Sequence, residues 1–505
     1  MNNKIVINTD GARQPEAGND LHESRSNYLK SSNAEEKFEA TVAVVGFNRL
    51  EKTKECVESL LKYTTDVRYK LVLVDNGSSD GTLEYFEKVD CPDKLIISIT
   101  KNIGSSYPTR HVLQHFEGDY IVFLANDLIV TSNWLSNLIK CAKSDYKIGL
   151  VQPVSSNVSN NQQVNLEYSN RLQMQEEAKK YNVSDPRKWH ERVRIITLGN
   201  LITRECLTTL GSLFDAGFFH DFVDDDLAFR IRRAGYKVIL AKDTWIHHNH
   251  NFREYEDKNK ELYIENLRNG KYNFSQKYYG IDAWEDTNNF EYSMISMIKA
   301  PKRARIINVL GIDVKCGTPI LEIKNKLRGF GIFNTRLSAY PQDAKYFLDL
   351  KTICEGVVKC DRIDYLSSNF MSERFDYIML GNPINLYREP YKLLQDIINL
   401  SGSEGQIIIK LRNTFDYKTL VNILGQKQVY DENSGLHISL EELNKWIVEM
   451  GYTICELKGE SDINPDNGDY LRGIVKRVID SKDEDAVYNN IAVKDYIISI
   501  TKTNK

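Results

Sequence analysis

The stretch that decides the fold is TVAVVGFNRLEKTKECVESLLKYTTDVRYKLVLVDNGSSDGT, residues 41–82. It begins with an apolar run at 41–47, which is typical of a buried strand. Residues 50–63 then place apolar side chains at helical spacing, and 70–75 is a second apolar run that ends in the turn-rich sequence NGSSDG. Strand, helix and strand in this order predict two parallel strands joined by a crossover helix.

The same alternation continues along the chain. Two further apolar runs, LIISIT at 95–100 and YIVFLAND at 120–127, read as strands, and sheet-like segments return at 193–204 and 236–248. Residues 155–195 interrupt this rhythm because they are rich in Asn, Gln and charge, which predicts a surface insertion or a mobile loop near a site. The whole pattern favours an α/β fold with a mostly parallel sheet covered by helices.

A second α/β rhythm starts at Arg305 and includes RIINVLGI, FDYIMLG, GQIIIKL and DYIISIT. The chain of 505 residues is too long for one ordinary hydrophobic core. We therefore expect a polar N-terminal tail at 1–37, an α/β domain at 38–252, a helical linker at 253–304 and a second α/β domain at 305–505.

Composition excludes several classes of function. With 66 basic and 70 acidic residues the net charge is −4, which offers no global attraction for nucleic acid or anionic lipid. Neither a membrane-spanning apolar run of about 18 residues nor a signal-peptide core is visible. The eight cysteines are scattered without a CxxC pair, so no zinc knuckle or disulfide framework is indicated. We expect a cytoplasmic protein without an integral membrane segment.

Polar side chains follow two of the predicted strands. Asp75 and the pair Asn126 and Asp127 come directly after buried strands, at the sheet edge where α/β proteins bind ligands. Asp75 could accept the N–H of a base such as uracil, and Asp127 could hold a hard divalent cation on a diphosphate. The alternatives are a plain Asp-Asn-Gly turn for Asp75 and a strand-end cap for Asp127.

The segment GFFHDFVDDDLAFRIRRAGYKV, 217–238, gathers four acidic residues just before a predicted helix: Asp221, Asp224, Asp225 and Asp226. Acidic residues are favoured at a helix N-terminus by the dipole, so some of them are expected to be caps. One of the four, held near an acceptor hydroxyl, could serve as a general base.

Three histidines follow in DTWIHHNHNF, residues 243–252. Strand alternation puts His248 and His250 on one face and His247 on the other. A lone histidine is usually structural, but three within four residues favour a contact with a metal ion or a phosphate about as strongly as a structural role.

Taken together and in this order, these segments resemble glycosyltransferase family 2, with the GT-A fold, over roughly residues 40–252. TVAVVGFNRLEKTKECVESLL resembles the family's opening strand and helix, VDNGSSDGT its nucleotide-binding stretch, and NIGSSYPTRH the segment that leads to its metal motif. AND, 125–127, stands where the family carries a DxD-type triplet, with the first acid lost. The resemblance implies a set of residues that bind the nucleotide sugar: Phe47, Asn48, Arg49, Asp75, Asn76, Gly77, Ser78, Arg110 and Asn126.

The resemblance also implies roles for the later motifs. Asp127 becomes the chief ligand of a Mn2+ or Mg2+ ion, together with His248, and Asp224 falls on the expected general base. The implied chemistry is a single in-line displacement that inverts the anomeric carbon. Three further residues are assigned to an acceptor or metal region: Asp226, His247 and His250.

The second domain resembles the latter half of a class I S-adenosylmethionine-dependent methyltransferase. The loop VLGIDVKCGTPIL supplies Gly311 and Gly317 but no GxGxG, and IFNTRLSAYPQ offers no acid for the ribose hydroxyls. GNPINLY stands where a Glu-His pair is common. We therefore favour a degenerate module that binds the acceptor, mediates homo-oligomerisation or braces the catalytic domain. Cofactor binding is the alternative.

The expected function is inverting, metal-dependent transfer of a sugar from a UDP-sugar to an acceptor hydroxyl. N-acetylglucosamine is the single sugar we expect, and the acceptor is a Ser or Thr of a surface protein such as flagellin, or else a glycan or lipid-linked sugar. Two alternatives stay open: a bifunctional glycosyltransferase and methyltransferase, and a catalytically silent sugar-binding scaffold. The retained Asp75, Asp127 and Asp224 argue against the scaffold.

Overall fold

The computed structural model divides the chain into two compact units, Met1–Asn288 and Asn289–Lys505, each described here by itself. The residues described are 3–12, 27, 29, 37–215, 217–218, 221–250, 260–302, 306–419, 435–461, 463, 468, 471–473, 475–476 and 484–503. Among them, no helix combines the length and the apolar character that crossing a membrane requires.

The first unit is built on one large sheet with the order β1-β4-β3-β2-β5-β9-β7-β10-β6, and β8 pairs with β10. Neighbours from β1 to β5 are parallel, whereas β9 runs antiparallel to both β5 and β7. The strands are β1 (Lys4–Ile7), β2 (Ala40–Gly46), β3 (Tyr69–Asn76), β4 (Lys94–Ile99), β5 (Tyr120–Ala125), β6 (Leu128–Ile129), β7 (Ile148–Ser155), β8 (Trp189–Glu191), β9 (Asn200–Thr203) and β10 (Lys237–His248).

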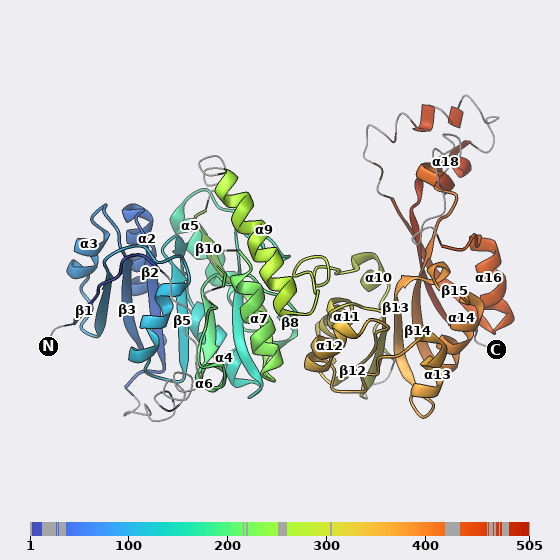
Figure 1. Cartoon of the computed structure of the whole chain (residues 1–505), viewed down its shortest axis with the longest axis horizontal. Helices are drawn as coiled ribbons and strands as arrows, with labels where there is room; N and C mark the ends of the chain where they lie inside the picture. Colours follow the sequence, from blue (N-terminus) through green and yellow to red (C-terminus); the bar gives the residue numbers. More distant parts are fainter. Residues whose placement is uncertain are drawn as a thin grey trace. The chain divides into compact units, whose positions relative to one another are not determined.

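Helices cover both faces of this sheet (Figure 1). One face packs against α2 (Leu50–Tyr63), α3 (Thr82–Lys88) and α4 (Trp134–Lys143), and the other against α5 (Arg171–Tyr181), α6 (Arg204–Leu210) and α7 (Val223–Arg233). The helix expected at 50–63 is confirmed at both ends, because its apolar residues face the sheet at helical spacing. The predicted α/β fold with a mostly parallel sheet is therefore confirmed.

The N-terminal segment differs from the polar tail that the sequence predicts. Lys4–Ile7 forms β1, a parallel edge strand on β4, because KIVI is a short run of strand-favouring residues that can add to an exposed edge. The prediction is wrong for these residues, while 13–26 lie outside the described part of the chain. The insertion at 155–195 contains α5 and β8, and α5 buries Met174 in the core.

The expected linker at 253–304 is divided between the two units. Helix α9 (Lys260–Lys277) and the residues up to Asn288 belong to the first unit, and α10 (Tyr292–Ser296) belongs to the second. Figure 1 shows α9 beside α7, and Lys277 Nζ lies 2.6 Å from Asp226 Oδ1. The prediction of a separate linker is wrong here. The charged residues of this segment suggested an exposed helix, but its other face is apolar and aromatic and packs on α7. Residues 251–259 lie outside the described part.

The second unit contains a six-stranded sheet with the order β12-β11-β13-β14-β16-β15. Its first four strands are parallel, and β16 is antiparallel to both of its neighbours. The strands are β11 (Ile307–Ile312), β12 (Thr335–Tyr340), β13 (Phe375–Pro383), β14 (Ser401–Arg412), β15 (Tyr452–Glu460) and β16 (Asp495–Lys502). The described helices are α11 (Thr318–Gly329), α12 (Phe347–Ile353), α13 (Leu366–Asn369), α14 (Pro390–Leu400), α16 (Leu440–Glu449) and α18 (Glu484–Ala492). The second predicted α/β domain is therefore present, and its sheet combines four parallel strands with an antiparallel pair.

Candidate active site

The candidate site lies where β5 ends and β10 approaches it. Asp127 follows β5 by two residues, and the antiparallel pairing of β6 with β10 sets His248 opposite Leu128, the next residue after Asp127. The Asn249 N–H donates to the Asp127 backbone oxygen at 2.8 Å, which fixes the chain between the two histidines. The pleat then turns His248 and His250 to one side, as the sequence predicts.

Asp127, His248 and His250 form one cluster. Asp127 Oδ1 lies 3.6 Å from His248 Nε2 and Asp127 Oδ2 lies 3.2 Å from His250 Nδ1, and ligand atoms of all three lie within 4.8 Å of one another. Asp127 and His248 are buried, and the two imidazole rings stack with centroids 5.0 Å apart. Burial raises the pKa of Asp127, but the hydrogen bonds from the two histidines outweigh it and hold that pKa well below the usual range.

These residues fit a divalent cation. His248 Nδ1 lies 2.9 Å from the Asn157 backbone oxygen, and only an N–H satisfies that carbonyl, so the lone pair of neutral His248 is on Nε2. Nε2 faces the Asp127 carboxylate: it donates to the carboxylate when the ring carries both protons, and its lone pair is available to a metal ion when the ring is neutral. One carboxylate and two imidazoles are ordinary ligands of transition-metal ions such as Mn2+ and Zn2+.

Arg49 reaches the same carboxylate from the other side, with Nη1 3.3 Å from Asp127 Oδ2. Its loop has an unusual backbone, because Asn48 and Arg49 adopt φ values of 54° and 61° in succession. The Asn48 N–H donates to Ser78 Oγ at 2.9 Å, and the Asn126 side-chain nitrogen donates to the Asn48 backbone oxygen at 2.9 Å. Asn126 thus supports this loop, and direct contact with a nucleotide stays a prediction for it.

Asp75 is a buried carboxylate one residue before the end of β3. Its Oδ1 accepts the Ser78 N–H at 3.2 Å, and burial raises its pKa against the opposing bonds from Ser78. Gly77 is required by close packing, since it has a φ of 81° and an added Cβ would lie 2.8 Å from Asn102 N. The Asn76 side chain donates to the Gly104 backbone oxygen at 2.8 Å, so it holds the next loop.

Arg110 and Phe47 are two other residues predicted to bind the nucleotide sugar. The Arg110 side chain packs on Tyr107, with its guanidinium 4.8 Å from the ring centroid and a hydrogen bond to the Tyr107 hydroxyl. Burial lowers the Arg110 pKa. Phe47 is a large apolar side chain at the start of the Arg49 loop and is 42% exposed, which leaves it accessible for stacking on a ligand.

The four acidic residues of 221–226 separate by environment. Asp225 is buried against Arg194, and burial raises its pKa in spite of that partner. Asp226 is buried among three donors: Arg230 Nε at 2.8 Å, Lys277 Nζ at 2.6 Å and the Tyr278 hydroxyl at 2.7 Å. Asp226 therefore anchors the α9 region to α7, and Asp225 ties α7 to Arg194. The acceptor or metal role predicted for Asp226 does not match this enclosed network.

Asp224 is only half-buried, and it accepts a hydrogen bond from the Thr197 hydroxyl. The pairing of β5 with β9 sets Phe123 opposite Asn200 in antiparallel register. Residues that precede Asn200, including Thr197, therefore extend past the end of β5, toward the edge that carries Asp127. Topology thus brings Asp224 and Asp127 to the same edge of the sheet.

His247 lies outside the cluster. Its Nδ1 is 3.0 Å from both the Ser156 and the Tyr168 hydroxyl oxygens, and it packs edge-on against the Tyr168 ring. Burial, and then the positive charge of Arg171, lower the pKa of His247 to about 4. A ring whose Nδ1 is engaged with two hydroxyls is a structural anchor for β10, so the metal or acceptor role predicted for His247 does not match its surroundings.

Sequence reasoning missed three supporting residues: Thr197, Asn157 and Ser156. Thr197 and Asp224 are 27 residues apart, and Asn157 and His248 are 91 apart, so no local spacing could pair them. For Ser156 and Asn157 the only signal was the polar composition of 155–195, which indicated a segment near a site without identifying these side chains, and Thr197 lies outside that segment.

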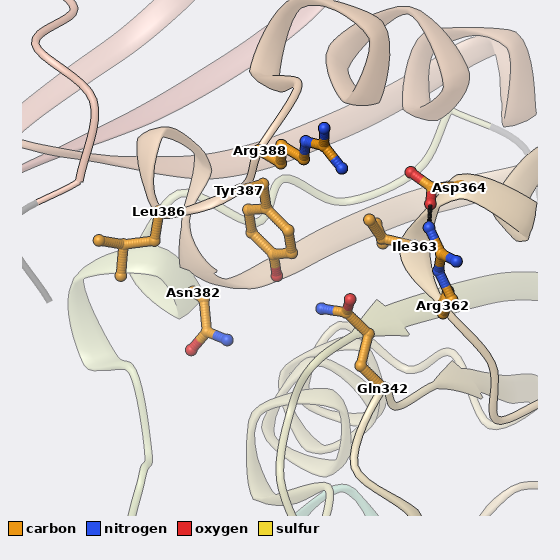
Figure 2. Close-up of a pocket in the computed structure, with 8 residues that line it drawn as sticks. All are labelled: Gln342, Arg362, Ile363, Asp364, Asn382, Leu386, Tyr387 and Arg388. Carbon is orange, nitrogen blue, oxygen red and sulfur yellow. Dashed lines mark hydrogen bonds and ion pairs between the residues drawn. The ribbon is translucent and has the colours of Figure 1, made fainter. Parts of the chain in front are cut away.

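The second unit has a pocket of about 320 Å³ past the ends of its parallel strands, shown in Figure 2. Two of its lining residues bond to Asp313, which accepts from the Gln342 N–H at 2.9 Å, from Gln342 Nε2 at 2.7 Å and from the Tyr387 hydroxyl at 2.7 Å. The glycines of the preceding loop are enclosed by apolar side chains: a Cβ at Gly317 would lie 2.3 Å from Ile353 Cδ1. The pocket is lined by Gln342, Arg362, Ile363, Asp364, Asn382, Leu386, Tyr387 and Arg388.

Comparison with known proteins shows a similarity within the first unit. Residues 41–204 match the family model described as glycosyl transferase family 2. An uncharacterized glycosyltransferase, YfnE, of Bacillus subtilis (strain 168) is 27% identical over 109 residues, which are 21% of this chain and 28% of that protein. A cholesterol galactosyltransferase of Borreliella burgdorferi is 30% identical over 110 residues, 22% of this chain and 30% of that protein. The chain thus spans less than a third of the length of either relative.

Among solved structures, the plantazolicin methyltransferase BpumL in complex with SAH is a distant likeness. The TM-score is 0.28 at 13% identity, and the alignment covers 43% of this chain and 81% of that one.

Proposed function

We propose, from the premise that residues 41–204 form a family 2 glycosyltransferase domain, that the chain transfers a sugar from a UDP-sugar to an acceptor hydroxyl and inverts the anomeric carbon. The observation that carries this proposal is the convergence of Asp127, His248 and His250 at one sheet edge. That edge also receives the ends of β2, β3 and β5, where ligands of α/β sheets bind.

Asp224 is the proposed general base. Its carboxylate takes the proton of the acceptor hydroxyl while the acceptor oxygen bonds to the anomeric carbon and the bond to the diphosphate oxygen breaks. Of the three acids of α7, Asp225 and Asp226 are enclosed by cationic partners, whereas Asp224 is half-buried next to a hydroxyl donor. The Thr197 hydrogen bond orients the carboxylate toward one rotamer.

A divalent cation held by Asp127, His248 and His250 would neutralise the charge of the diphosphate leaving group. The two imidazole ligands favour Mn2+ over Mg2+, because Mg2+ prefers oxygen ligands and an octahedral shell with several waters. We expect donor binding to be stronger in Mn2+ than in Mg2+ at equal concentration.

For the donor, Asp75 is the proposed acceptor of the uracil N–H, and Phe47, with its exposed ring, is the proposed stacking partner of the base. N-acetylglucosamine remains the sugar we propose. Release of UDP from a panel of UDP-sugars in Mn2+ tests this choice. Release from UDP-N-acetylglucosamine above all others supports it, and preference for another sugar refutes it.

For the acceptor, we propose a Ser or Thr hydroxyl of a protein that is modified in the cytoplasm before export, such as flagellin. Intact-mass measurement of surface proteins from a strain that lacks this chain tests the proposal. A missing N-acetylhexosamine mass on one protein is expected. Unchanged masses on every candidate protein would point instead to a glycan or lipid-linked acceptor.

The second unit is proposed to be a degenerate methyltransferase-like module that does not use S-adenosylmethionine. Two observations support this. Gln342 and Tyr387 already donate hydrogen bonds to the Asp313 carboxylate, and apolar side chains enclose Gly311 and Gly317. Isothermal titration of the full chain with S-adenosylmethionine should therefore show no heat of binding. Micromolar binding would favour the bifunctional alternative, in which the chain glycosylates and then methylates.

A further inference from the structure

The Arg49 guanidinium and His250 share one oxygen of Asp127. Arg49 Nη1 lies 3.3 Å from Asp127 Oδ2, and His250 Nδ1 lies 3.2 Å from the same atom. The Arg49 side chain is 43% exposed, and that of Asp127 is 7% exposed. A partly exposed cation therefore meets a buried anion at the Asp127 oxygen that also faces His250, one of the three clustered ligand residues. A metal ion must displace Arg49 from this oxygen, and two positive charges brought close together repel each other.

We propose that Arg49 keeps this site closed to a metal ion alone and opens it to a metal ion that arrives with a diphosphate. Alone, the ion must break the ion pair between Arg49 and Asp127 and leave Arg49 without an anionic partner. With a diphosphate present, the guanidinium gains phosphate oxygens, for which its planar fork of N–H donors is suited. This inference rests on the proposed function, in which the donor carries a diphosphate.

The backbone of the loop explains why only the side chain has to move. Asn48 is tied to the nucleotide segment through the Ser78 hydroxyl, and its Oδ1 accepts the Ser79 N–H at 2.9 Å. Asn126 holds the Asn48 backbone oxygen. The Cα of Arg49 is thereby fixed beside both the Asp75 segment and Asp127, so the long side chain can exchange a carboxylate for a phosphate without a change of fold.

The consequence is a coupling between two ligands. In the wild-type chain, Mn2+ and UDP should each strengthen the binding of the other, and by linkage the factor is the same in both directions. Removing the Arg49 charge removes the competitor of the metal ion and one binding group of the diphosphate. A partly exposed ion pair changes an equilibrium by up to about fivefold. Arg49→Gln should therefore bind Mn2+ alone about fivefold more tightly, bind UDP alone more weakly, and lose about fivefold or more of the coupling.

The experiment measures binding without turnover. Free Mn2+ is followed by electron paramagnetic resonance during titration of the full chain, with and without saturating UDP, for the wild type and three variants. Arg49→Gln removes the charge, and Arg49→Lys keeps it and should bind Mn2+ alone as weakly as the wild type. Lys54→Gln is the matched control, because it removes a positive charge from α2, the helix that directly follows Arg49, at a position where the partner is Glu51. It should change neither affinity. Circular dichroism melting checks that each variant is folded.

Equal or weaker binding of Mn2+ alone by folded Arg49→Gln, or coupling equal to that of the wild type, would overturn the role of Arg49. Tighter binding by Lys54→Gln to the same degree would also overturn it, because the effect would then be general electrostatics. Different results would refute the proposed function and the Arg49 inference. The proposed function fails if the wild-type chain binds no UDP in Mn2+, whereas the Arg49 inference fails if UDP binds and the variants do not differ.

Discussion

Asn182 is the residue whose loss should do most to misplace the histidines from a distance. Its Oδ1 accepts the Trp245 N–H at 2.7 Å, and its Nδ2 donates to the Ser132 backbone oxygen and to Thr131 Oγ1, each at 2.9 Å. Trp245 stands where the pairing of β10 with β7 shifts register, three residues before His248. The Asn182 side chain thus takes the place of a strand partner for the Trp245 N–H and fixes β10, which carries His248.

Asn182→Ala leaves the buried Trp245 N–H and the carbonyl of half-buried Ser132 without their partner. Each unsatisfied group costs about 1–3 kcal/mol, so we expect a loss of about 3 kcal/mol in the free energy of unfolding. That is a large part of a typical stability of about 5–15 kcal/mol. The misplaced strand should also weaken Mn2+ binding.

Urea unfolding followed by tryptophan fluorescence measures this loss. Four of the five tryptophans, Trp134, Trp189, Trp245 and Trp284, lie in the first unit, so the signal reports mainly on it. Asn165→Ala is the control, an exposed asparagine of the same insertion, and it should change stability by less than about 0.5 kcal/mol. A loss below about 1 kcal/mol for Asn182→Ala, or unchanged Mn2+ affinity, would refute the reasoning.

Three further predictions concern the site itself. Asp127→Ala should abolish Mn2+ binding measured by paramagnetic resonance, and retained affinity would move the metal ion elsewhere. Asp226→Asn should lower the free energy of unfolding by about 3 kcal/mol, because it weakens a buried network with Lys277, and a change within error in urea melts would contradict that network. Burial raises the pKa of Asp75, so its carboxylate becomes protonated at a higher pH than usual. UDP affinity should therefore fall as the pH drops through that raised pKa and recover as the pH rises. Asp75→Asn should make this titration flat, and an equal pH dependence in that variant would exclude Asp75 as its source.

What the sequence could predict was local. The period of apolar residues located α2 and the strands β2, β3 and β5, and the ends of those strands brought Asp75 and Asp127 to one edge. Alternation along β10 alone selected His248 and His250 as a pair. The short strand β1 was missed because four residues give too little periodicity to separate a strand from a tail.

The remaining features depend on contacts between distant parts of the chain. Asp226 reads as a candidate ligand until Lys277, 51 residues later, is seen to reach it. The same holds for Thr197 beside Asp224. In the sequence, register alone selects Asp224 among its acidic neighbours, whereas the folded chain separates them by burial and by partner.

The central claim is that Asp224 removes a proton at a site where Asp127 holds the metal ion. The most direct measurement is the rate of sugar transfer by Asp224→Asn in Mn2+, with UDP affinity measured on the same sample. We expect the UDP affinity of this variant to stay at the wild-type value while its rate of sugar transfer falls by about 100- to 10,000-fold. Transfer at the wild-type rate by a variant that still binds UDP would contradict it.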